Sequence, residues 1–459
     1  MTNQINRFHL PPIVFIITIT LVSLFLGFGI ANVKLLPGLT IGAAICIFFI
    51  SLWNIEISFY ILIFAMLLSP EFIVAELGKH GAAATRGLTL RLDDLLILLI
   101  LLSWFIRTAI FKDIGLFIKT PLNRPIGFYI LVNIFSTIIA LLFGKVEFIL
   151  SSLYLLKYIE YFILYFMVAN FLREKAQARR LVMASFITCL LVCAYAIAYI
   201  PTGERVTAPF EGQGEANTLG GYLLLLMSLV IGLLTQYRGW RERTFFIAFL
   251  GVIILPFIAT LSRSSWIGLL PLLTVLFIFS KRKLNLSIIY LLFFVIFIFL
   301  SPKVVINRLS STFEADRYYP ETQKVMGIGF DPSASDRIAR FKISLKNWSK
   351  YPILGAGVTG GGLIDGQYFR ILEETGSLGL IIFGWLIYSI FINAYAVFKR
   401  LEEPFLKGIS LGLIIGLSGL LAHSIGTSTF ILVRIMEPFW FFVAIVIMSP
   451  NLSEKVQPT

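Results

Sequence analysis

Apolar residues form long, nearly continuous runs along the chain, and polar residues gather between these runs. Runs of about 20 apolar residues have the length that a helix needs to cross the hydrocarbon core of a membrane. Segments such as 95–102 and 288–300 are continuously apolar, whereas the strands of an outer-membrane barrel alternate apolar and polar positions. The pattern therefore predicts an all-α polytopic membrane protein.

We expect about 12–14 transmembrane helices, because several of the apolar runs are short or separated by tight turns. The candidate spans are 12–32, 37–53, 56–75, 92–111, 125–143, 150–172, 181–201, 218–236, 244–261, 264–280, 286–301, 378–398, 406–424 and 430–448.

One long polar segment, residues 301–377, separates the last three spans from the others. We therefore divide the chain into N-terminal transmembrane helices (1–204), central transmembrane helices (205–300), this polar loop, and C-terminal transmembrane helices with a tail (378–459). A chain this apolar does its aqueous chemistry where it keeps its polar residues. Functional residues are expected first in the loop.

The composition agrees with a membrane protein: 58% of the residues are hydrophobic and only 14% are charged. The net charge of +13 follows mainly from Lys and Arg in alternate connections between the spans, as the positive-inside rule predicts. A basic surface for an anionic lipid-linked substrate is the alternative explanation of this charge, and nucleic acid is not expected as a partner. Connection 76–91 departs partly from the pattern. The orientation places the N terminus inside and the 301–377 loop on the extracytoplasmic side.

Cysteine and histidine give no sign of a metal centre. The three cysteines lie in apolar runs, where a thiol behaves as a small core side chain, and the three histidines are scattered. We therefore expect neither a metal site nor a cofactor.

The loop carries a predicted amphipathic helix over residues 336–350. Its apolar positions are spaced by three and four residues, which is one face of a helix, and they are Ile338, Phe341, Leu345 and Trp348. The other face carries Arg337, Arg340, Lys342, Lys346 and Lys350. A basic amphipathic helix of this kind lies in the membrane interface. Alternatively, Arg337 and Arg340 bind a phosphate group, because guanidinium groups bind phosphate oxygens in a bidentate manner.

A glycine-rich stretch, residues 351–362, follows this helix and is predicted to be a turn or loop. It lacks the lysine and the strand–loop–helix context of a phosphate-binding P-loop, so nucleotide binding is not expected. Asp365 and Tyr368 come next. Asp365 is a candidate general base, and the alternative is a solvated carboxylate or a helix cap.

Further polar residues lie near the predicted outer ends of the spans: Asn217, Arg263, His423 and Arg434. Charged side chains at such positions are functional candidates, because burying an unpaired charge in a membrane is costly. Arg434 also has a structural alternative, an ion pair with Glu437 three residues later.

Two more groups of charges lie within or beside the spans. Asp93 and Asp94 open the 92–111 span, and Lys157 and Glu160 have the spacing of a structural ion pair inside the 150–172 span.

Three segments resemble, in the right order, the superfamily of O-antigen ligases and polymerases, which are bacterial membrane glycosyltransferases. The serine-rich run S-R-S-S-W-I-G (262–268) is similar to one family element. Residues 336–357, from D-R-I-A-R to I-L-G-A-G, are similar to a second, and D-G-Q-Y-F-R-I-L-E-E-T-G-S-L-G-L (365–380) resembles the third. E-A-N-T-L-G (215–220) is a weaker fourth match.

The resemblance implies transfer or polymerisation of a polyprenyl-diphosphate-linked oligosaccharide at the outer face of the bacterial inner membrane. It implies a donor of that kind, a glycan or lipid acceptor, the surrounding bilayer, and polysaccharide assembly proteins as further partners. Asp365, Arg263 and Arg337 are the expected catalytic residues. The expected substrate-binding residues are Arg340, Arg434, Tyr368, Asn217 and His423.

One position departs from the family pattern. Ligases of the family usually have His and Asn where this chain has Asp365 and Gly366. A carboxylate can also accept a proton, so we expect Asp365 to keep the role of base, with His423 in reserve, and the change favours a polymerase over a ligase.

Two other functions are open at this point. A lipid-linked oligosaccharide flippase or another transporter would have a similar number of spans, with charges deep in the bundle and internal repeats. A membrane scaffold for a polysaccharide assembly complex is the third interpretation.

Overall fold

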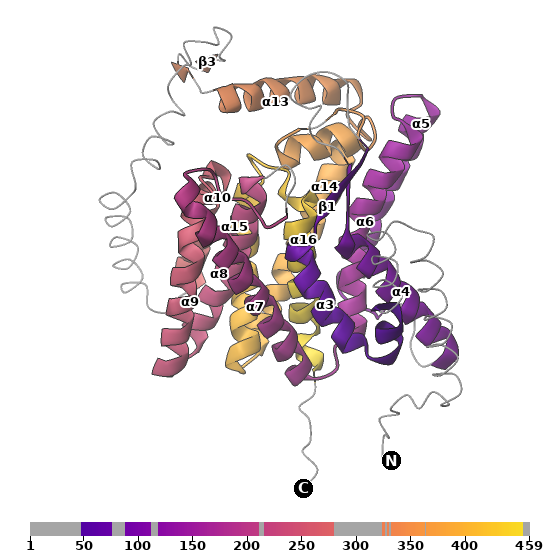
Figure 1. Ribbon diagram of the computed structural model, residues 1–459. Coiled ribbons are helices and arrows are strands. Elements are labelled where there is room, and N and C mark those ends of the chain that lie inside the picture. The colour runs from indigo at the N-terminus through magenta and orange to yellow at the C-terminus, as the bar shows by residue number, and fades with distance from the viewer. Residues whose placement is uncertain are drawn as a thin grey trace, which may run out of the picture.

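The structure, a computed structural model, describes residues 47–75, 88–111, 118–210, 215–279, 324–325, 328–329, 332–362 and 364–452. The principal helices and strands are α3 (Ile55–Leu68), β1 (Glu71–Ala75), β2 (Leu88–Arg91), α4 (Leu92–Phe111), α5 (Asn123–Leu142), α6 (Phe148–Phe171), α7 (Lys175–Tyr199), α8 (Ala216–Gln236), α9 (Trp240–Ala259), α10 (Arg263–Phe279), β3 (Lys324–Val325), β4 (Ile328–Gly329), α13 (Pro332–Lys350), α14 (Gln367–Arg400), α15 (Pro404–His423) and α16 (Val433–Met448). Most helices stand side by side, and α13 lies across one end of this bundle (Figure 1).

Eight helices in the described part of the chain are long and apolar enough to cross a membrane. They are α5, α6, α7, α8, α9, α14, α15 and α16, and α3 and α10 are shorter apolar helices. The prediction of an all-α polytopic membrane protein is confirmed. The predicted spans 12–32 and 286–301, and most of 37–53, lie outside the described residues.

One predicted span, 56–75, is wrong in its second half. Helix α3 ends at Leu68, and residues 71–75 form strand β1, which pairs antiparallel with β2 so that Glu71 faces Arg91. Ser69 takes an extended conformation directly before Pro70, and the residue before a proline disfavours helix. The run F-I-V that follows is rich in the aromatic and β-branched residues that favour strands.

Helix α14 begins eleven residues before the predicted span 378–398 and changes direction at Gly376. This glycine has φ 68° and ψ −166°, which is a conformation that glycine adopts readily and other residues do not. A Cβ atom at this position would also lie 2.3 Å from the carbonyl oxygen of Ile353. Residues 367–375 are thus a separate helical segment beside the polar loop, and the membrane helix follows the kink.

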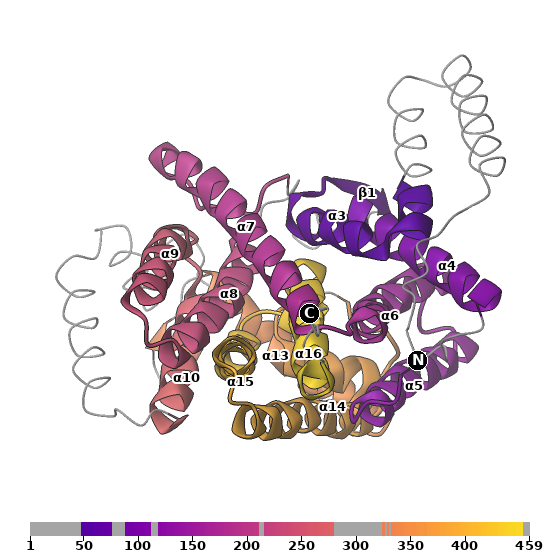
Figure 2. The same ribbon diagram turned by 90° about the horizontal axis from the view of Figure 1, so that it is seen from below.

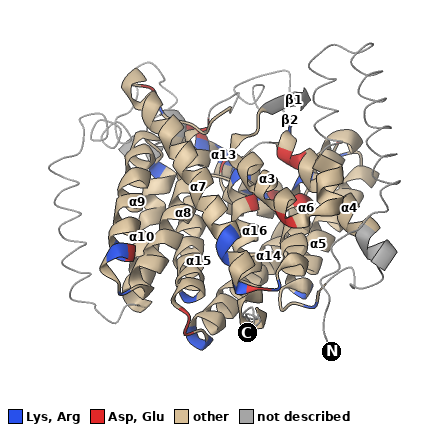
Figure 3. Ribbon diagram, turned by 60° about the horizontal axis from the view of Figure 1, so that its bottom comes forward, with Lys and Arg blue, Asp and Glu red and all other residues tan. Residues whose placement is uncertain are grey.

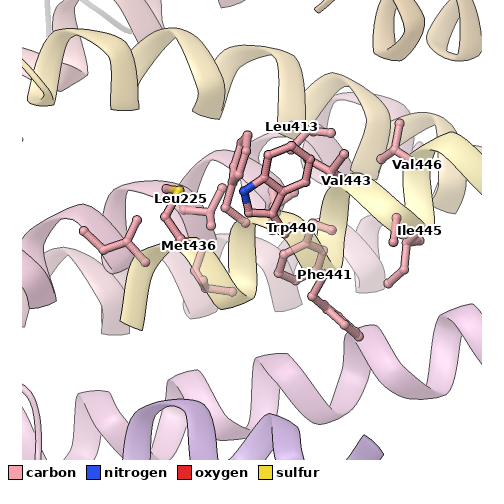
Figure 4. Packing of buried hydrophobic residues seen from close by; sticks show 14 of the residues in the cluster. Leu225, Leu413, Met436, Trp440, Phe441, Val443, Ile445 and Val446 are labelled. Atoms are coloured by element: carbon pink, nitrogen blue, oxygen red, sulfur yellow. The ribbon is translucent and has the colours of Figure 1, made fainter. Parts of the chain in front are cut away.

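Helix α16 lies near the middle of the bundle, with α6, α8, α14 and α15 around it (Figure 2). Its side chains, among them Trp440 and Val443, pack near Leu225 of α8 and Leu413 of α15 (Figure 4). The indole of Trp440 also packs edge-on against Phe162 of α6, with ring centroids 4.8 Å apart. Because α16 is buried on all sides, its residues are apolar all round rather than on one face.

Glycines allow α15 to approach α8 and α10 closely. A Cβ atom on Gly232 of α8 would lie 2.2 Å from the carbonyl oxygen of Gly408, and one on Gly268 of α10 would lie 2.8 Å from that of Gly419. Small residues at such contacts are typical of membrane helices, where close packing replaces the hydrophobic effect as the force for association. The first contact joins the end of α8 to the start of α15, and the second joins the start of α10 to the end of α15.

Charged residues are rare along the helices and gather at their ends and around α4 and α6 (Figure 3). Arg179 at the start of α7, Arg241 at the start of α9, and Lys399 and Lys407 beside the α14–α15 connection lie at the end of the bundle away from α13. These are among the charges from which the positive-inside rule predicts the orientation, with α13 on the extracytoplasmic side.

Candidate functional site

Helix α13 is held against the first segment of α14. The rings of Phe341 and Phe369 stack with centroids 4.1 Å apart and an angle of 15° between their planes. The hydroxyl of Ser344 donates to Glu373 Oε2 at 2.8 Å, and the side-chain amide of Asn347 donates to Glu373 Oε1 at 2.5 Å. A single carboxylate therefore holds the second half of α13.

The face of α13 that packs differs from the predicted apolar face at Leu345, whereas Phe341 and Trp348 of that face do make packing contacts. Leu345 is 43% exposed, and the neighbouring Ser344 is only 1% exposed. The polar Ser344 is buried because Glu373 accepts its hydrogen bond. The outward face consequently combines two apolar side chains with a row of amines, namely Ile343, Leu345, Lys342, Lys346 and Lys350.

The glycine-rich stretch 351–362 forms turns, as predicted, and lies against the same segment of α14. The backbone N–H of Ala356 donates to the carbonyl oxygen of Glu373, and that of Gly357 donates to the carbonyl oxygen of Glu374. The hydroxyl of Ser136, on α5, lies 2.5 Å from the carbonyl oxygens of both Leu354 and Glu374. These contacts tie the loop to α5 as well as to α14.

A buried ion pair lies beneath this loop. Arg370 Nε lies 3.0 Å from Glu374 Oε1, and the hydroxyl of Tyr158 on α6 donates to Glu374 Oε2 at 3.0 Å. The adjacent residues Glu373 and Glu374 thus face different neighbours, and both of them support the loop. The sequence analysis did not single out Arg370 or Glu374, although their i, i+4 spacing is a recognisable signal for an ion pair.

Above this support, the structure brings Arg337 and Asp365 together. Arg337 Nε lies 4.0 Å from Asp365 Oδ2, and the two side chains are 21% and 28% exposed. Both the carboxylate and the guanidinium therefore remain open to a substrate. This is the pair of catalytic candidates that the sequence analysis placed on the same side of the membrane.

The start of α10 meets the same place through the turn at Gly426. A Cβ atom on Gly426 would lie 2.5 Å from Ser264 Oγ and 3.5 Å from Arg337 Nη1. Arg263 is the residue before Ser264 and is partly buried. The end of α15, the start of α10 and α13 therefore converge, and they bring Ser264, the residue after Arg263, close to Arg337.

Asn217 and His423 form the floor of this region. Asn217 Oδ1 accepts a hydrogen bond from Ser262 at 2.8 Å. His423 is fully buried; its Nδ1 lies 2.7 Å from the hydroxyl of Thr429, and its Nε2 has no hydrogen-bond partner in the described part of the chain. A Cβ atom on Gly221, in the second turn of α8, would lie 3.4 Å from Nε2. The imidazole therefore has one enclosed nitrogen that is not engaged in a hydrogen bond with a described residue.

The other predicted substrate-binding residues have different surroundings. The hydroxyl of Tyr368 donates to the carbonyl oxygen of Leu421 at 2.7 Å, and Arg340 Nε lies 2.9 Å from Asp336 on the exposed face of α13. Arg434 is 2% exposed, and its guanidinium donates to three backbone carbonyl oxygens at 2.9–3.1 Å, those of Leu67, Ser69 and Pro209.

The partners expected for the remaining charges are partly corrected. Glu437 lies 3.5 Å from Arg91, so the pairing that the structure records for it is not with Arg434. Lys157 and Glu160 do form the expected pair at 3.9 Å, but Lys157 also contacts Asp94 more closely. These side chains belong to a buried cluster that was not predicted from the sequence, because its members are far apart along the chain.

A comparison with models of protein families finds a similarity in the central part of the chain. Residues 252–384 match a family model described as O-antigen ligase. This match confirms the resemblance to O-antigen ligases and polymerases that was drawn from the motifs. A search of the curated proteins finds no match.

The O-antigen ligase match contains the Arg337–Asp365 pair, Arg263 and the whole of α13. Asn217, His423 and Arg434 lie outside it. Together, the match and the apolar helices indicate a multi-pass bacterial membrane protein that transfers glycosyl groups. The converging side chains can supply positive charge and a proton acceptor, which are the two requirements of such a transfer.

Proposed function

We propose that this protein transfers or polymerises polyprenyl-diphosphate-linked oligosaccharide at the outer face of the bacterial inner membrane. The observation that supports this most directly is the Arg337–Asp365 pair. A cation and a carboxylate, each partly exposed, lie close together within the matched region and at the end of the bundle where α13 lies.

In this proposal Arg337 and Arg263 bind the diphosphate of the donor. A guanidinium group presents a planar set of donors that fits phosphate oxygens and stays charged at any physiological pH. As the bond between the sugar and the diphosphate breaks, negative charge grows on the leaving oxygen. Fixed positive groups stabilise that charge more in the transition state than in the ground state. No separate cofactor is needed for this role.

Asp365 is proposed as the general base. The acceptor hydroxyl attacks the anomeric carbon of the donor sugar, its proton passes to the Asp365 carboxylate, and polyprenyl diphosphate leaves. The product is a longer glycan with a new glycosidic bond. The alternative base is His423, whose Nε2 is not engaged in a hydrogen bond with a described residue.

The outward face of α13 is proposed to lie in the membrane interface. Ile343 and Leu345 are 56% and 43% exposed, and the neighbouring lysines are exposed as well. An amphipathic helix of this composition buries its apolar side chains at the boundary between headgroups and acyl chains. The isoprenoid tail of the donor would then stay in the bilayer while its diphosphate reaches the arginines.

The test is a transfer assay with the protein reconstituted in liposomes that contain polyprenyl-diphosphate oligosaccharide and no added nucleotide. Gel analysis of the glycolipids shows a ladder for a polymerase and one shifted band on an added acceptor for a ligase. The presence of Asp365 where the ligases usually have His favours the polymerase. Arg263→Ala is the control, and it should abolish either product while the protein still inserts in the membrane. Equal activity in the wild type and in Arg263→Ala would refute the mechanism.

A transporter of lipid-linked oligosaccharide is the second candidate function. The buried charges around Arg91, Asp94 and Lys157 are of the kind expected in a transport pathway. A dithionite or lectin protection assay on reconstituted liposomes measures whether the lipid-linked sugar crosses the bilayer. Translocation without transfer would favour this candidate over the glycosyltransferase.

A further inference from the structure

Six charged side chains meet inside the bundle, apart from the Arg337–Asp365 pair. They come from the β2–α4 junction, from α6 and from α16, and they are Arg91, Asp93, Asp94, Lys157, Glu160 and Glu437. None is more than 15% exposed, and Asp93 and Glu437 are completely buried. The site described above uses none of them.

The two cations do not balance the four carboxylates. Arg91 pairs with Asp93 and lies 3.5 Å from Glu437, and Lys157 pairs with Asp94 and lies 3.9 Å from Glu160. With every group ionised, the cluster carries two negative charges more than its own cations neutralise. Arg434 is the nearest further cation on α16, and its guanidinium is engaged by the carbonyls of Leu67, Ser69 and Pro209.

Several carboxylate oxygens in the cluster have no hydrogen-bond donor among the described residues. Both oxygens of Glu437, Oδ1 of Asp94 and Oε1 of Glu160 are buried in this state. By contrast, Asp93 Oδ1 accepts from Ser69 at 2.8 Å, and Asp94 Oδ2 accepts from the backbone N–H of Arg91 at 2.8 Å. Buried carboxylate oxygens without donors are destabilising unless a cation or a proton reaches them.

The spacing of these oxygens suits a metal ion. Asp93, Asp94 and Glu437 each offer one carboxylate oxygen, and these three atoms lie within 4.8 Å of one another. Oxygen atoms bound to one Ca²⁺ ion at 2.3–2.6 Å lie up to about 5 Å apart. Carboxylate oxygens are also the ligands that Ca²⁺ and Mg²⁺ prefer.

We propose that Asp93, Asp94 and Glu437 bind one hard divalent cation of the Ca²⁺ or Mg²⁺ class inside the bundle. A charge of +2 neutralises the excess of the cluster, and carboxylate oxygens that otherwise lack hydrogen-bond donors become ligands of the ion. The ion joins the start of α4 to α16, and Lys157 and Glu160 on α6 surround it. Its role is to stabilise the bundle, and it does not depend on the transfer reaction.

The experiment measures thermal unfolding of the full chain in detergent by tryptophan fluorescence. The protein is first treated with EDTA and then titrated with Ca²⁺ and, separately, with Mg²⁺. The expected result for the wild type is a saturable rise of several degrees in the unfolding temperature with at least one of these ions. Glu437→Gln and Asp94→Asn should weaken the apparent affinity at least tenfold. The exposed Glu204→Gln should behave like the wild type.

A direct measurement keeps the proposal falsifiable if these variants fail to fold. Tb³⁺ is an oxygen-seeking probe for such sites, and Trp440 lies one helical turn from Glu437, where it can sensitise the luminescence of the bound ion. Saturable luminescence from the wild type that Ca²⁺ displaces supports the site. No stabilisation by either ion and no displaceable luminescence would overturn it, and would mean that protons neutralise Glu437 and Glu160 instead.

Discussion

Arg337 Nε lies 4.0 Å from Asp365 Oδ2, which is within the range of an ion pair but longer than a hydrogen bond. The pair is held by contacts between buried and half-buried side chains. Phe341 stacks on Phe369 one turn from Arg337, and Glu373 binds the far half of α13. The polar residues at the surface therefore have fixed positions although they remain accessible.

Replacing Arg337 with alanine should reduce transfer by about 10²–10³-fold, which is typical for the loss of one group that stabilises developing negative charge. Lys350 is the matched control, because it is an exposed cation at the other end of the same helix. Lys350→Ala should stay within about threefold of the wild type, since a helix rises about 1.5 Å per residue and Lys350 therefore lies about 20 Å from Arg337. Initial rates of glycan transfer in liposomes measure both variants. Equal losses in the two variants would show that α13 supplies only general positive charge.

Asp365→Asn tests the proposed base. The amide has nearly the same shape and cannot accept the proton, so the rate should fall by about 10²–10⁴-fold. Asp336→Asn is the control, because Asp336 is 61% exposed and lies one residue before Arg337. The pH dependence of the rate is recorded with both. If Asp365→Asn retains activity and His423→Gln does not, His423 is the base and Asp365 only positions Arg337.

The attachment of α13 can be tested with two serines of the same helix. Ser344 is buried and donates to Glu373, whereas Ser349 is exposed and donates to Lys346 within its own helix. Ser344→Ala leaves Glu373 short of a donor, at a cost of about 1–3 kcal/mol, and amide hydrogen exchange in 340–350 should become faster. Ser349→Ala should leave the exchange unchanged. Unchanged exchange in both would mean that the stacking of Phe341 on Phe369 is sufficient.

The glycine contacts between α8 and α15 predict a stability difference. A Cβ atom on Gly232 would lie 2.2 Å from the Gly408 carbonyl oxygen, which cannot move without moving α15. Gly232→Ala should therefore lower the free energy of unfolding by about 1–3 kcal/mol through overpacking. Gly251 of α9 has nothing within 4 Å of its Cβ position, and Gly251→Ala should be neutral or slightly stabilising, as alanine favours helix. Unfolding temperatures in one detergent compare the two.

The long helices could be predicted from the sequence because an apolar run of the right length has few other structures in a membrane. The predicted span 218–236, for example, ends where α8 does and begins two residues after the start of α8. The error at 71–75 arose because apolar periodicity cannot distinguish a helix from a strand in a short run. Here Pro70 and the pairing with residues 88–91 decide the structure.

The proximity of Arg337 and Asp365 could be anticipated from the sequence, since the predicted topology placed both residues on the same side of the membrane. The packing of α13 could not be predicted, because it depends on a contact between residues 29 positions apart. Glu373 accepts a hydrogen bond from Ser344, and this polar residue is buried as a result. The cluster of Asp93, Asp94 and Glu437 was also missed, since more than 300 residues separate its two halves. Pair spacing along one helix cannot reveal such a group.

The position of Arg434 has a consequence for how the protein is made. Its guanidinium binds the carbonyl oxygens of Pro209, Ser69 and Leu67, which precede it in the chain by 225, 365 and 367 residues. A ribosome delivers those connections to the membrane long before it delivers α16. Until α16 inserts, they lack this donor, and the centre of the bundle lacks the helix that fills it. Insertion of α16 is therefore the step that converts a set of inserted helices into a mature protein, and a chain halted before Val433 would stay recognisable to membrane proteases.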